Sequence, residues 1–427
     1  MRRALVLLAV ALTSALVLAG CSTTAPNSGA PNSGAQTARS ESLITDFGVT
    51  RAEITLGALT DYSGPFKDLA LGAVHGHQRW VNETNAVGGI CARKIKLDIR
   101  DYGDNTGKAR TQYADLEPKV LGFMHILGSS VNKALSQSMI ENETTVVALS
   151  KSSELLNNPY IIIPATTYDL EMINGLSDLM GDGKIRDGDA IGHIWLDDEY
   201  GANGLRGAQH FAQLHNLTLR NAKVTATDLD MRDIVAAFAG EPRVTAIALS
   251  TTPEQTASAA MVNQQLGLNV PMIGNSPVFT PQLLTGPAAG ALGNLSVMAS
   301  SVPFSSDVPK ARHVAGAYQQ AGYEELPNIA VPYGYAIGEI WGQLLKRACT
   351  NGNMSRAGIQ EALRQSTSIT TDELIVDLDF AQPGAPAARE IYVSVPDAGV
   401  PGGLRQVKPR FVALEAQTYV APHQRGD

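Results

Sequence analysis

Residues 54–100 read ITLGALTDYSGPFKDLALGAVHGHQRWVNETNAVGGICARKIKLDIR, and this stretch decides the fold. Its short segments at residues 54–59 and 95–100 predict strands. Residues 69–85 between them predict a helix, which two successive glycines end. A strand, a helix and a strand in this order favour two parallel strands joined by a right-handed crossover.

The same alternation continues over most of the chain. We expect strands at residues 122–127, 145–149, 190–196, 217–224, 244–249 and 270–273, and helices that begin near 108 and 131 or cover 170–179, 202–215, 231–239 and 253–266. About 400 residues are too many for one ordinary hydrophobic core. The predicted fold class is therefore α/β, with two doubly wound lobes built on parallel sheets.

Polar residues follow the predicted strands at the point where each strand ends. Ligands of open parallel sheets bind at this edge, so these residues are candidates for a binding site. Short hydroxyls and glycines leave backbone N–H groups accessible and suit a small polar or anionic ligand. The candidates are Tyr62, Ser129, Ser130, Ser150, Ser152 and Ser153 in the first lobe and Tyr200, Thr251, Thr252 and Ser276 in the second.

The N-terminus has the features of a bacterial lipoprotein signal. Arg2 and Arg3 precede an apolar run too short to span a membrane, and LAGC at residues 18–21 resembles a lipobox. We expect a signal peptide at residues 1–20, a lipid on Cys21 and a flexible spacer at residues 21–48, in which APNSG occurs twice. The alternative is an uncleaved anchor that ends in a chance cysteine. Both interpretations place the folded part outside the cytoplasm and attach it to the cell membrane.

Two cysteines, Cys91 and Cys349, remain once Cys21 is assigned to the lipid. A pair of cysteines persists as a disulfide in an oxidising compartment, so we predict a bond between them. The alternative is two buried free thiols.

Charge and motifs exclude several classes of function. Without the predicted signal peptide, the chain carries 31 Lys and Arg against 41 Asp and Glu, a net charge of −10. This acidic balance argues against nucleic acid and against an anionic membrane surface as partners. The sequence has no Walker, G-x-S-x-G or G-x-G-x-x-G motif. We expect no catalytic residues, no cofactor and no metal.

Four segments, in the same order along the chain, resemble the type I solute-binding proteins of ABC transporters. They are ITLGALTDYSGPF from Ile54, GGICARKIKLDIRDYGDN from Gly88, ALSKSSEL from Ala148 and IGHIWLDDEYGANGLRGAQ from Ile191. The similarity extends from about residue 52 to about residue 395. More narrowly, the segments resemble the leucine/isoleucine/valine-binding branch of that family.

The resemblance implies two Rossmann-like lobes, joined by three crossing segments, that close around one ligand. It places the N-terminal lobe at residues 49–166 and 302–377 and the C-terminal lobe at residues 167–301 and 378–427. The crossings are expected near residues 164–168, 299–303 and 377–380. A helix at residues 333–348 is expected to return to the first lobe and bring Cys349 toward Cys91.

The resemblance also implies how a ligand is held. Amino-acid binders of this branch hold the ligand carboxylate with a serine hydroxyl and backbone amides at two strand ends. Ser129 or Ser130 matches the first strand end, and Ser152 with Ser153 matches the second. Tyr200 matches a tyrosine that lines the cleft. The alternative for each serine is helix N-capping, and the alternative for Tyr200 is a core aromatic.

Two departures from this branch concern the ligand. Where amino-acid binders place a glutamate against the ligand ammonium, residues 274–277 read GNSP, and where they often place an aromatic residue, Thr251 and Thr252 occur. A buried ammonium without a carboxylate partner is costly. Our hypothesis is that the ligand is not a branched-chain amino acid, or that another acid such as Asp61 holds its amine.

The sequence thus predicts a monomeric, lipid-anchored receptor outside the cytoplasm. It would capture a small polar or carboxylate-bearing solute, amino-acid-like or related, by hinge closure and deliver it to an ABC permease. The first alternative is a sensor on the same fold that signals through a membrane partner. The second is an extracellular hydrolase, which the lack of catalytic residues disfavours.

Overall fold

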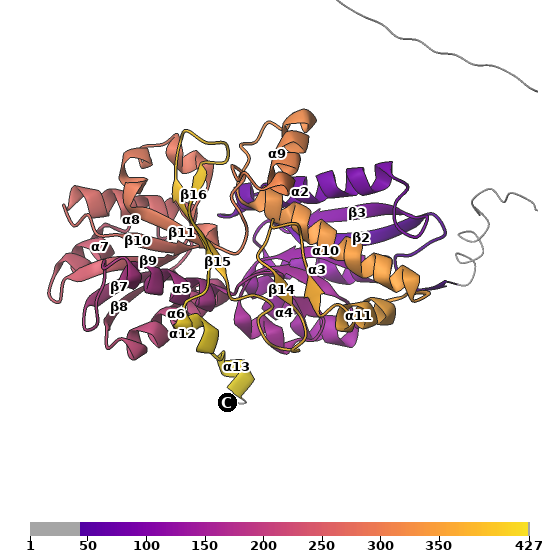
Figure 1. Cartoon of the computed structure of the whole chain (residues 1–427), viewed down its shortest axis with the longest axis horizontal. Helices are drawn as coiled ribbons and strands as arrows, with labels where there is room; N and C mark the ends of the chain where they lie inside the picture. The colour runs from indigo at the N-terminus through magenta and orange to yellow at the C-terminus, as the bar shows by residue number, and fades with distance from the viewer. Residues whose placement is uncertain (1–42, 426–427) are drawn as a thin grey trace, which may run out of the picture.

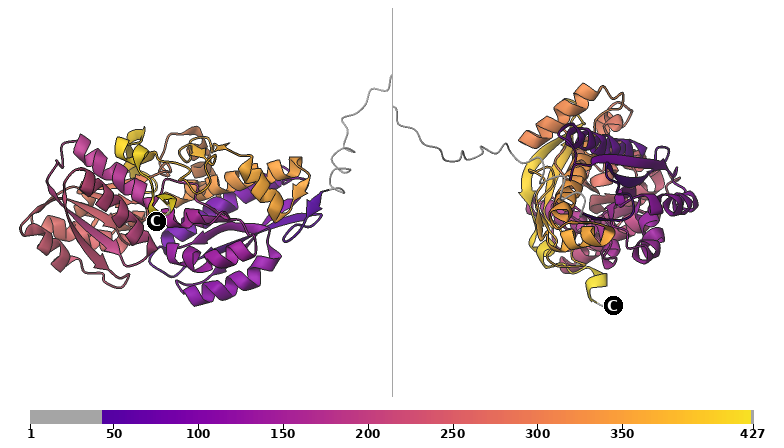
Figure 2. Two further views of the ribbon diagram at one scale, coloured as in Figure 1. Left: turned by 90° about the horizontal axis from the view of Figure 1, so that it is seen from below. Right: turned by 90° about the vertical axis from the view of Figure 1, so that its right-hand side faces the viewer.

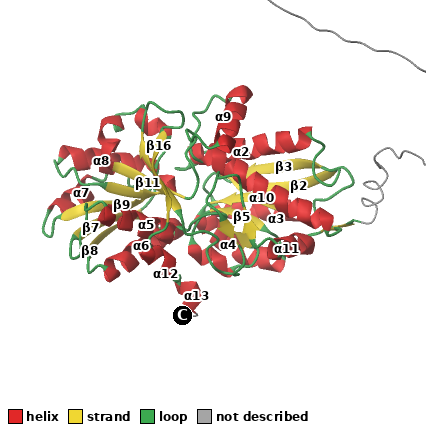
Figure 3. Cartoon of the chain, viewed as in Figure 1, coloured by secondary structure: helices red, strands yellow, loops and turns green. Residues whose placement is uncertain are grey.

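The computed structural model describes residues 43–425, which form two α/β lobes side by side (Figure 1). The predicted signal peptide, Cys21 and the spacer up to residue 42 lie outside the described residues. Helices pack around a central sheet in each lobe (Figure 3), so the predicted arrangement of two α/β lobes is confirmed. Within residues 43–425, no helix is both long and apolar enough to cross a membrane.

The N-terminal lobe contains five parallel strands in the order β3-β2-β4-β5-β6. Residues 54–60 of β2 are buried or half-buried, because β2 is an inner strand with helices on both faces. The strands are β2 (Glu53–Thr60), β3 (Lys94–Asp101), β4 (Gly122–Leu127), β5 (Val146–Leu149) and β6 (Ile161–Ile162). The helices are α2 (Lys67–Ala86), α3 (Thr106–Leu116), α4 (Ser129–Glu141), α9 (Pro309–Ala321), α10 (Ala330–Thr350) and α11 (Arg356–Arg364).

The C-terminal lobe contains seven strands in the order β16-β15-β11-β10-β9-β7-β8. Five are parallel as expected, but β15 and β16 follow each other through a short connection and therefore pair antiparallel. The strands are β7 (Ala190–Leu196), β8 (Thr218–Val224), β9 (Val244–Ser250), β10 (Met272–Asn275), β11 (Leu295–Ala299), β15 (Ile391–Pro396) and β16 (Leu404–Phe411). The helices are α5 (Tyr168–Gly181), α6 (Glu199–Leu214), α7 (Arg232–Ala239), α8 (Pro253–Gln265), α12 (Leu414–Thr418) and α13 (Pro422–Arg425).

The last residues lie at the junction of the two lobes (Figure 2). Helix α12 packs on α5 of the C-terminal lobe, whereas α13 packs on residues 153–157 of the N-terminal lobe. The C-terminal segment therefore contacts both lobes.

Residues 43–48 belong to the folded body, which corrects the predicted extent of the spacer. They include β1 (Ile44–Thr45), which pairs in parallel with β12 (Asn353–Met354). The carboxylate of Asp46 accepts a hydrogen bond of 3.1 Å from the backbone N–H of Arg356. Both partners lie far along the chain, so the polar local composition could not reveal the pairing.

Three segments cross between the lobes, at residues 163–167, 300–308 and 380–390. The second crossing segment is hydrogen bonded to the residues that precede the third crossing segment: Val376 N donates to Ser300 O at 2.9 Å. A parallel bridge between Thr166 and Ala388 joins the first to the third.

The first two crossings lie where they were predicted, but the third lies after residues 377–380. Its shift has a simple cause. Strand β14 (Leu378–Asp379) still pairs with β13 (Ser368–Ile369), and both contribute to the core of the N-terminal lobe.

Helices α2 and α10 lie in close contact and hold the returning chain against the N-terminal lobe. A Cβ atom on Gly76 would lie 2.2 Å from the carbonyl oxygen of Val331, and one on Gly334 would lie 2.2 Å from that of Ala73. These distances leave no room for any side chain, so the contact requires glycine on both helices. The predicted disulfide between Cys91 and Cys349 is confirmed, and it joins the segment after α2 to the last turn of α10.

Replacing both Cys91 and Cys349 by serine should lower the free energy of unfolding by about 2–5 kcal/mol. The reason is that the disulfide restricts an unfolded chain over a sequence separation of 258 residues. Urea denaturation under non-reducing conditions measures the change, and wild-type protein with added reductant is the control. Two reactive thiols in denatured, unreduced wild-type protein would contradict the bond.

Candidate functional site

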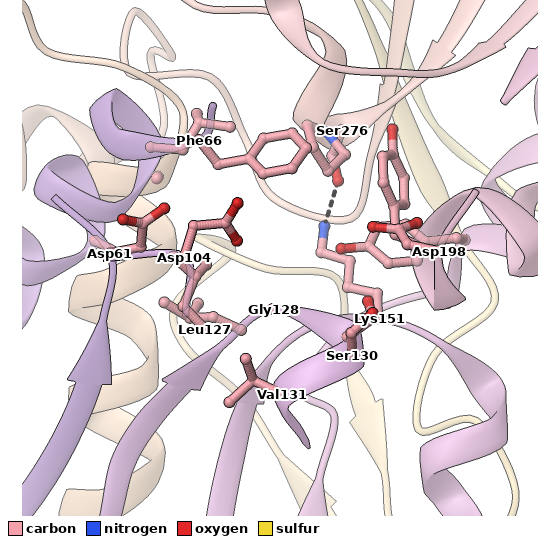
Figure 4. Close-up of a pocket in the computed structure, with 18 of the residues that line it drawn as sticks. Asp61, Phe66, Asp104, Leu127, Gly128, Ser130, Val131, Lys151, Asp198 and Ser276 are labelled. Atoms are coloured by element: carbon pink, nitrogen blue, oxygen red, sulfur yellow. Dashed lines mark hydrogen bonds between the residues drawn. The ribbon is translucent and has the colours of Figure 1, made fainter. Parts of the chain in front are cut away.

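A cavity of about 170 Å³ lies between the two lobes (Figure 4). The N-terminal lobe contributes the residues that follow β2, β3, β4 and β5, together with parts of α2 and the start of α10. The C-terminal lobe contributes the residues that follow β7 and β10 and the start of α5. The cavity thus lies at the carboxyl ends of the strands, as the sequence analysis predicted.

One wall of the cavity is the N-terminus of α4. Gly128 joins β4 to this helix with φ +88°, a conformation that favours glycine. Ser129, Ser130 and Val131 then form the first turn of the helix and line the cavity. No side chain caps α4, so its first N–H groups and the positive end of its dipole are available to an anion.

Most of the remaining wall is apolar or aromatic. It consists of Phe66, Leu69, Ala73, Leu127, Leu149, Pro277, Ile329 and Ala330 together with Tyr102, Tyr168, Tyr200 and Tyr333. Phe66 of the N-terminal lobe meets Tyr200 of the C-terminal lobe edge to face, with ring centres 6.0 Å apart. Such a wall stabilises the hydrocarbon part of a ligand by removing it from water.

Lys151 is the one Lys or Arg among the described residues that line the cavity. Its ammonium donates a hydrogen bond to Ser276 Oγ at 2.9 Å (Figure 4) and another to Glu171 Oε1 at 3.1 Å. The Lys151 side chain is 8% exposed and the Glu171 side chain is 0% exposed. Since Lys151 follows β5 while Glu171 and Ser276 belong to the C-terminal lobe, this ion pair joins the lobes at the cavity.

Three aspartates also line the cavity. Asp61 and Asp104 lie near each other on the side of Phe66, and burial together with the charge of Asp61 raises the pKa of Asp104 (Figure 4). Burial raises the pKa of Asp198 to about 6, although its carboxylate accepts a hydrogen bond from Gly201 N at 2.8 Å. The cavity therefore holds acidic groups as well as one cation.

The structure brings four of the predicted ligand-binding residues to the cavity, namely Ser129, Ser130, Tyr200 and Ser276. Ser129 Oγ also shares a hydrogen bond of 2.6 Å with Ser150 Oγ, which lies behind it. The other predicted residues do not line the cavity; these are Tyr62, Ser150, Ser152, Ser153, Thr251 and Thr252.

Ser152 and Ser153 instead contact the other lobe. Ser152 Oγ donates to Glu199 Oε1 at 3.3 Å, and Ser153 Oγ donates to Asp169 Oδ2 at 2.6 Å. Lys133 of α4 also pairs with Glu199, at 2.6 Å. These residues hold the lobes together outside the cavity.

Thr251 and Thr252 stabilise the chain locally. Thr252 Oγ1 accepts a hydrogen bond of 3.2 Å from Gln255 N and caps α8, while Thr251 Oγ1 bonds to Thr256 Oγ1 at 2.8 Å. Tyr62 is half-buried, and its backbone N–H donates to Asp101 Oδ1 at 3.1 Å. Helix capping, the alternative weighed for the serines, is thus the role of Thr252.

Sequence reasoning missed Lys151, Glu171 and the apolar wall. Lys151 could have been found, because it is the one charged residue in the Ser-Lys-Ser-Ser run after a predicted strand. The sequence had suggested that no acid lies near Ser276. Glu171 of α5 lies there and accepts a hydrogen bond from Ser276 N, but it is already paired with Lys151. Tyr333 lies at the start of α10. Its place in the cavity wall depends on the packing of α10 against α2, which local sequence does not reveal.

The comparison with known proteins identifies the family. A family model described as "Periplasmic binding protein" matches residues 53–399. A solved structure, a fatty acid ABC transporter substrate-binding protein from Thermomonospora curvata, is 32% identical with a TM-score of 0.85, over 88% of this chain and 97% of that one. The chain belongs to the periplasmic binding protein family. The predicted family and its type I fold are thereby confirmed.

Other solved periplasmic binding proteins share the fold at lower identity. A branched chain amino acid ABC transporter protein from Thermus thermophilus with bound valine is 16% identical, with a TM-score of 0.77, over 86% of this chain and 98% of that one. A leucine binding protein from Thermotoga maritima is 15% identical, with a TM-score of 0.69, over 84% of this chain and 99% of that one. No curated protein sequence matches the chain.

Periplasmic binding proteins bind solutes outside the cytoplasm, and the cavity between the lobes is placed for this role. In residues 43–425, no group of three or more His, Cys, Asp or Glu side chains is arranged to hold a metal ion.

Asp198→Asn should change how stability depends on pH. The pKa of Asp198 is about 6 in the folded protein and ordinarily 3.8. Its contribution to stability is therefore fully present below about pH 4 and is lost as the pH rises to about 6. Asparagine stays neutral and still caps α6, so the variant should be more stable than the wild type above pH 6, by up to about 2–3 kcal/mol.

Urea denaturation between about pH 4 and 8 measures this difference. The wild type should lose stability relative to the variant over the lower half of that range. The same pH dependence in both proteins would contradict the assignment.

Proposed function

We propose that the protein binds a molecule with a hydrocarbon body and a carboxylate, such as a fatty acid, and delivers it unchanged to an ABC permease. It does so as a monomer anchored to the cell membrane by a lipid on Cys21. The observation that carries this proposal is the character of the cavity, whose wall is mainly apolar and includes one cation and an uncapped helix N-terminus.

The apolar wall favours a hydrocarbon body over a purely polar solute. Burying one methylene group contributes about 0.8 kcal/mol, so a few methylenes outweigh a single neutral hydrogen bond of about 1 kcal/mol. The name of the Thermomonospora curvata protein, a fatty acid ABC transporter substrate-binding protein, supports the same class of ligand.

The charged groups disfavour a branched-chain amino acid. Its ammonium would need a free carboxylate close to the carboxylate site. Of the two acids on that side, Glu171 is already paired with Lys151 and hydrogen bonded to Ser276 N at 3.1 Å, and Asp198 already accepts a hydrogen bond from Gly201 N at 2.8 Å. A second candidate is a carboxylate ligand with an amine at its far end, because Asp61 and Asp104 line that side of the cavity.

Closure of the lobes is the proposed mechanism. Both lobes contribute to the cavity wall, and three adjacent crossing segments connect them. A ligand that contacts both walls stabilises the closed arrangement, which a permease can then distinguish from the open one.

Straight-chain carboxylates from hexanoate to tetradecanoate should bind with an affinity that rises about fourfold with each added methylene until the cavity is full. Isothermal titration calorimetry measures the series, with leucine, isoleucine and valine as controls. Sub-micromolar binding of any of these three amino acids would contradict the proposed ligand class. A preference for 8-aminooctanoate over octanoate would favour the second candidate.

Cys21→Ala should release the protein from the membrane, because the proposed lipid on Cys21 is its only proposed attachment. Cell fractionation followed by immunoblotting measures the change in a host that processes lipoproteins. Cys91→Ser with Cys349→Ser is a matched control that leaves Cys21 in place and should stay in the membrane fraction. Membrane retention of the Cys21→Ala protein would contradict the lipid anchor.

A further inference from the structure

We propose that Lys151 selects an anionic head group and couples its binding to closure, through the same ion pair that joins the lobes. This inference rests on the proposed function and names the residue that sets its specificity. Three observations support the inference: the contacts of Lys151, its burial, and the fact that its partners belong to the other lobe.

Lys151 has a donor left for a ligand. An ammonium has three N–H donors, and among the described residues two of them have acceptors, Glu171 Oε1 and Ser276 Oγ. The side chain is 8% exposed and lines the cavity. A ligand carboxylate at this position would form a charge-assisted hydrogen bond shielded from water, which is among the stronger kinds.

Glu171 balances the charge of Lys151, and its carboxylate is not free to bind a cationic group of a ligand. Its Oε1 accepts from Lys151, and its Oε2 accepts from Asn275 Nδ2 and Ser276 N, both at 3.1 Å. The carboxylate is therefore fully engaged within the protein. A ligand ammonium at this position would meet the ammonium of Lys151 and find no free acceptor on Glu171.

The ion pair forms only when the lobes are together. Lys151 follows β5 of the N-terminal lobe, whereas Glu171 lies in α5 and Ser276 follows β10 of the C-terminal lobe. The ring of Tyr333, 5.1 Å from the ammonium, belongs to the same lobe as Lys151 and keeps the cation at the cavity. A carboxylate bound to Lys151 would therefore lie at the place where the C-terminal lobe arrives on closure. Its binding and the closure of the lobes would then favour each other.

The test compares two matched pairs of substitutions. The first, Lys151→Met with Glu171→Gln, removes both charges and so does not leave the buried carboxylate of Glu171 without its partner. The control, Lys133→Met with Glu199→Gln, removes an ion pair that also joins the lobes, at 2.6 Å, but Lys133 does not line the cavity. A third variant, Lys151→Arg, retains the charge.

The ligands are decanoate and decan-1-ol, titrated by calorimetry, with small-angle X-ray scattering as the measure of closure. The first pair should weaken decanoate binding about ten- to hundredfold, leave decan-1-ol within about threefold and reduce the closure that decanoate causes. The control pair and Lys151→Arg should keep the preference for decanoate over decan-1-ol.

Three results would overturn the inference while the proposed function stands: an unchanged affinity of the first pair for decanoate, an equal loss for decanoate and decan-1-ol, or the same loss of preference in the control pair. Loss of the preference in Lys151→Arg would also contradict a role for the charge, even if the first pair did not fold. If wild-type protein bound none of the straight-chain carboxylates, the proposed function itself would fail and the inference with it.

Discussion

The close contact between α2 and α10 is the constraint on which the binding cavity depends. The chain leaves the N-terminal lobe after β6 and returns only after the strands β7–β11 of the other lobe are complete. Gly76 and Gly334 allow the two helix backbones to touch at the point of return. Leu69 and Ala73 of α2 thereby come to lie beside Ile329 and Tyr333, and together they form one side of the cavity. A single added methyl group at either glycine would collide with a backbone carbonyl.

Several polar groups at the cavity already have partners inside the protein. Ser129 bonds to Ser150, Tyr200 bonds to the carbonyl oxygen of Thr251 at 3.4 Å, and Ser276 bonds to Lys151. Groups engaged in this way are held in fixed positions and need little reordering when a ligand arrives. Under the proposed function, the hydrocarbon part of the ligand and its head group would contact different parts of the wall.

Local sequence patterns predicted the parts of the fold that local physics determines. Strand β2 was recognisable because burial on both faces leaves a nearly continuous apolar segment. Strand β3, at the edge of the sheet, was recognisable because its apolar residues alternate with polar ones. The pairing of β1 with β12, the antiparallel β15 and β16 and the later third crossing were not predicted, because each depends on partners far along the chain.

The candidate site shows the same limit at the level of single residues. Hydroxyl residues at strand ends line the cavity, cap a helix or join the lobes, and their sequence does not distinguish these positions. Ser129, Thr252 and Ser153 illustrate one outcome each. Lys151 was recognisable as an unusual residue in a run of serines, but its partner Glu171 required the arrangement of both lobes.

The disulfide also has a consequence for the order in which the protein matures. Cys91 and Cys349 are separated by 258 residues, and the five parallel strands of the C-terminal lobe lie between them. For a chain that passes through a translocation channel from its N-terminus, oxidation must wait until residue 349 has emerged. Most of the polypeptide is then present, so the bond can form only after α10 has emerged. In such a chain the disulfide therefore forms late and does not guide the early steps of folding.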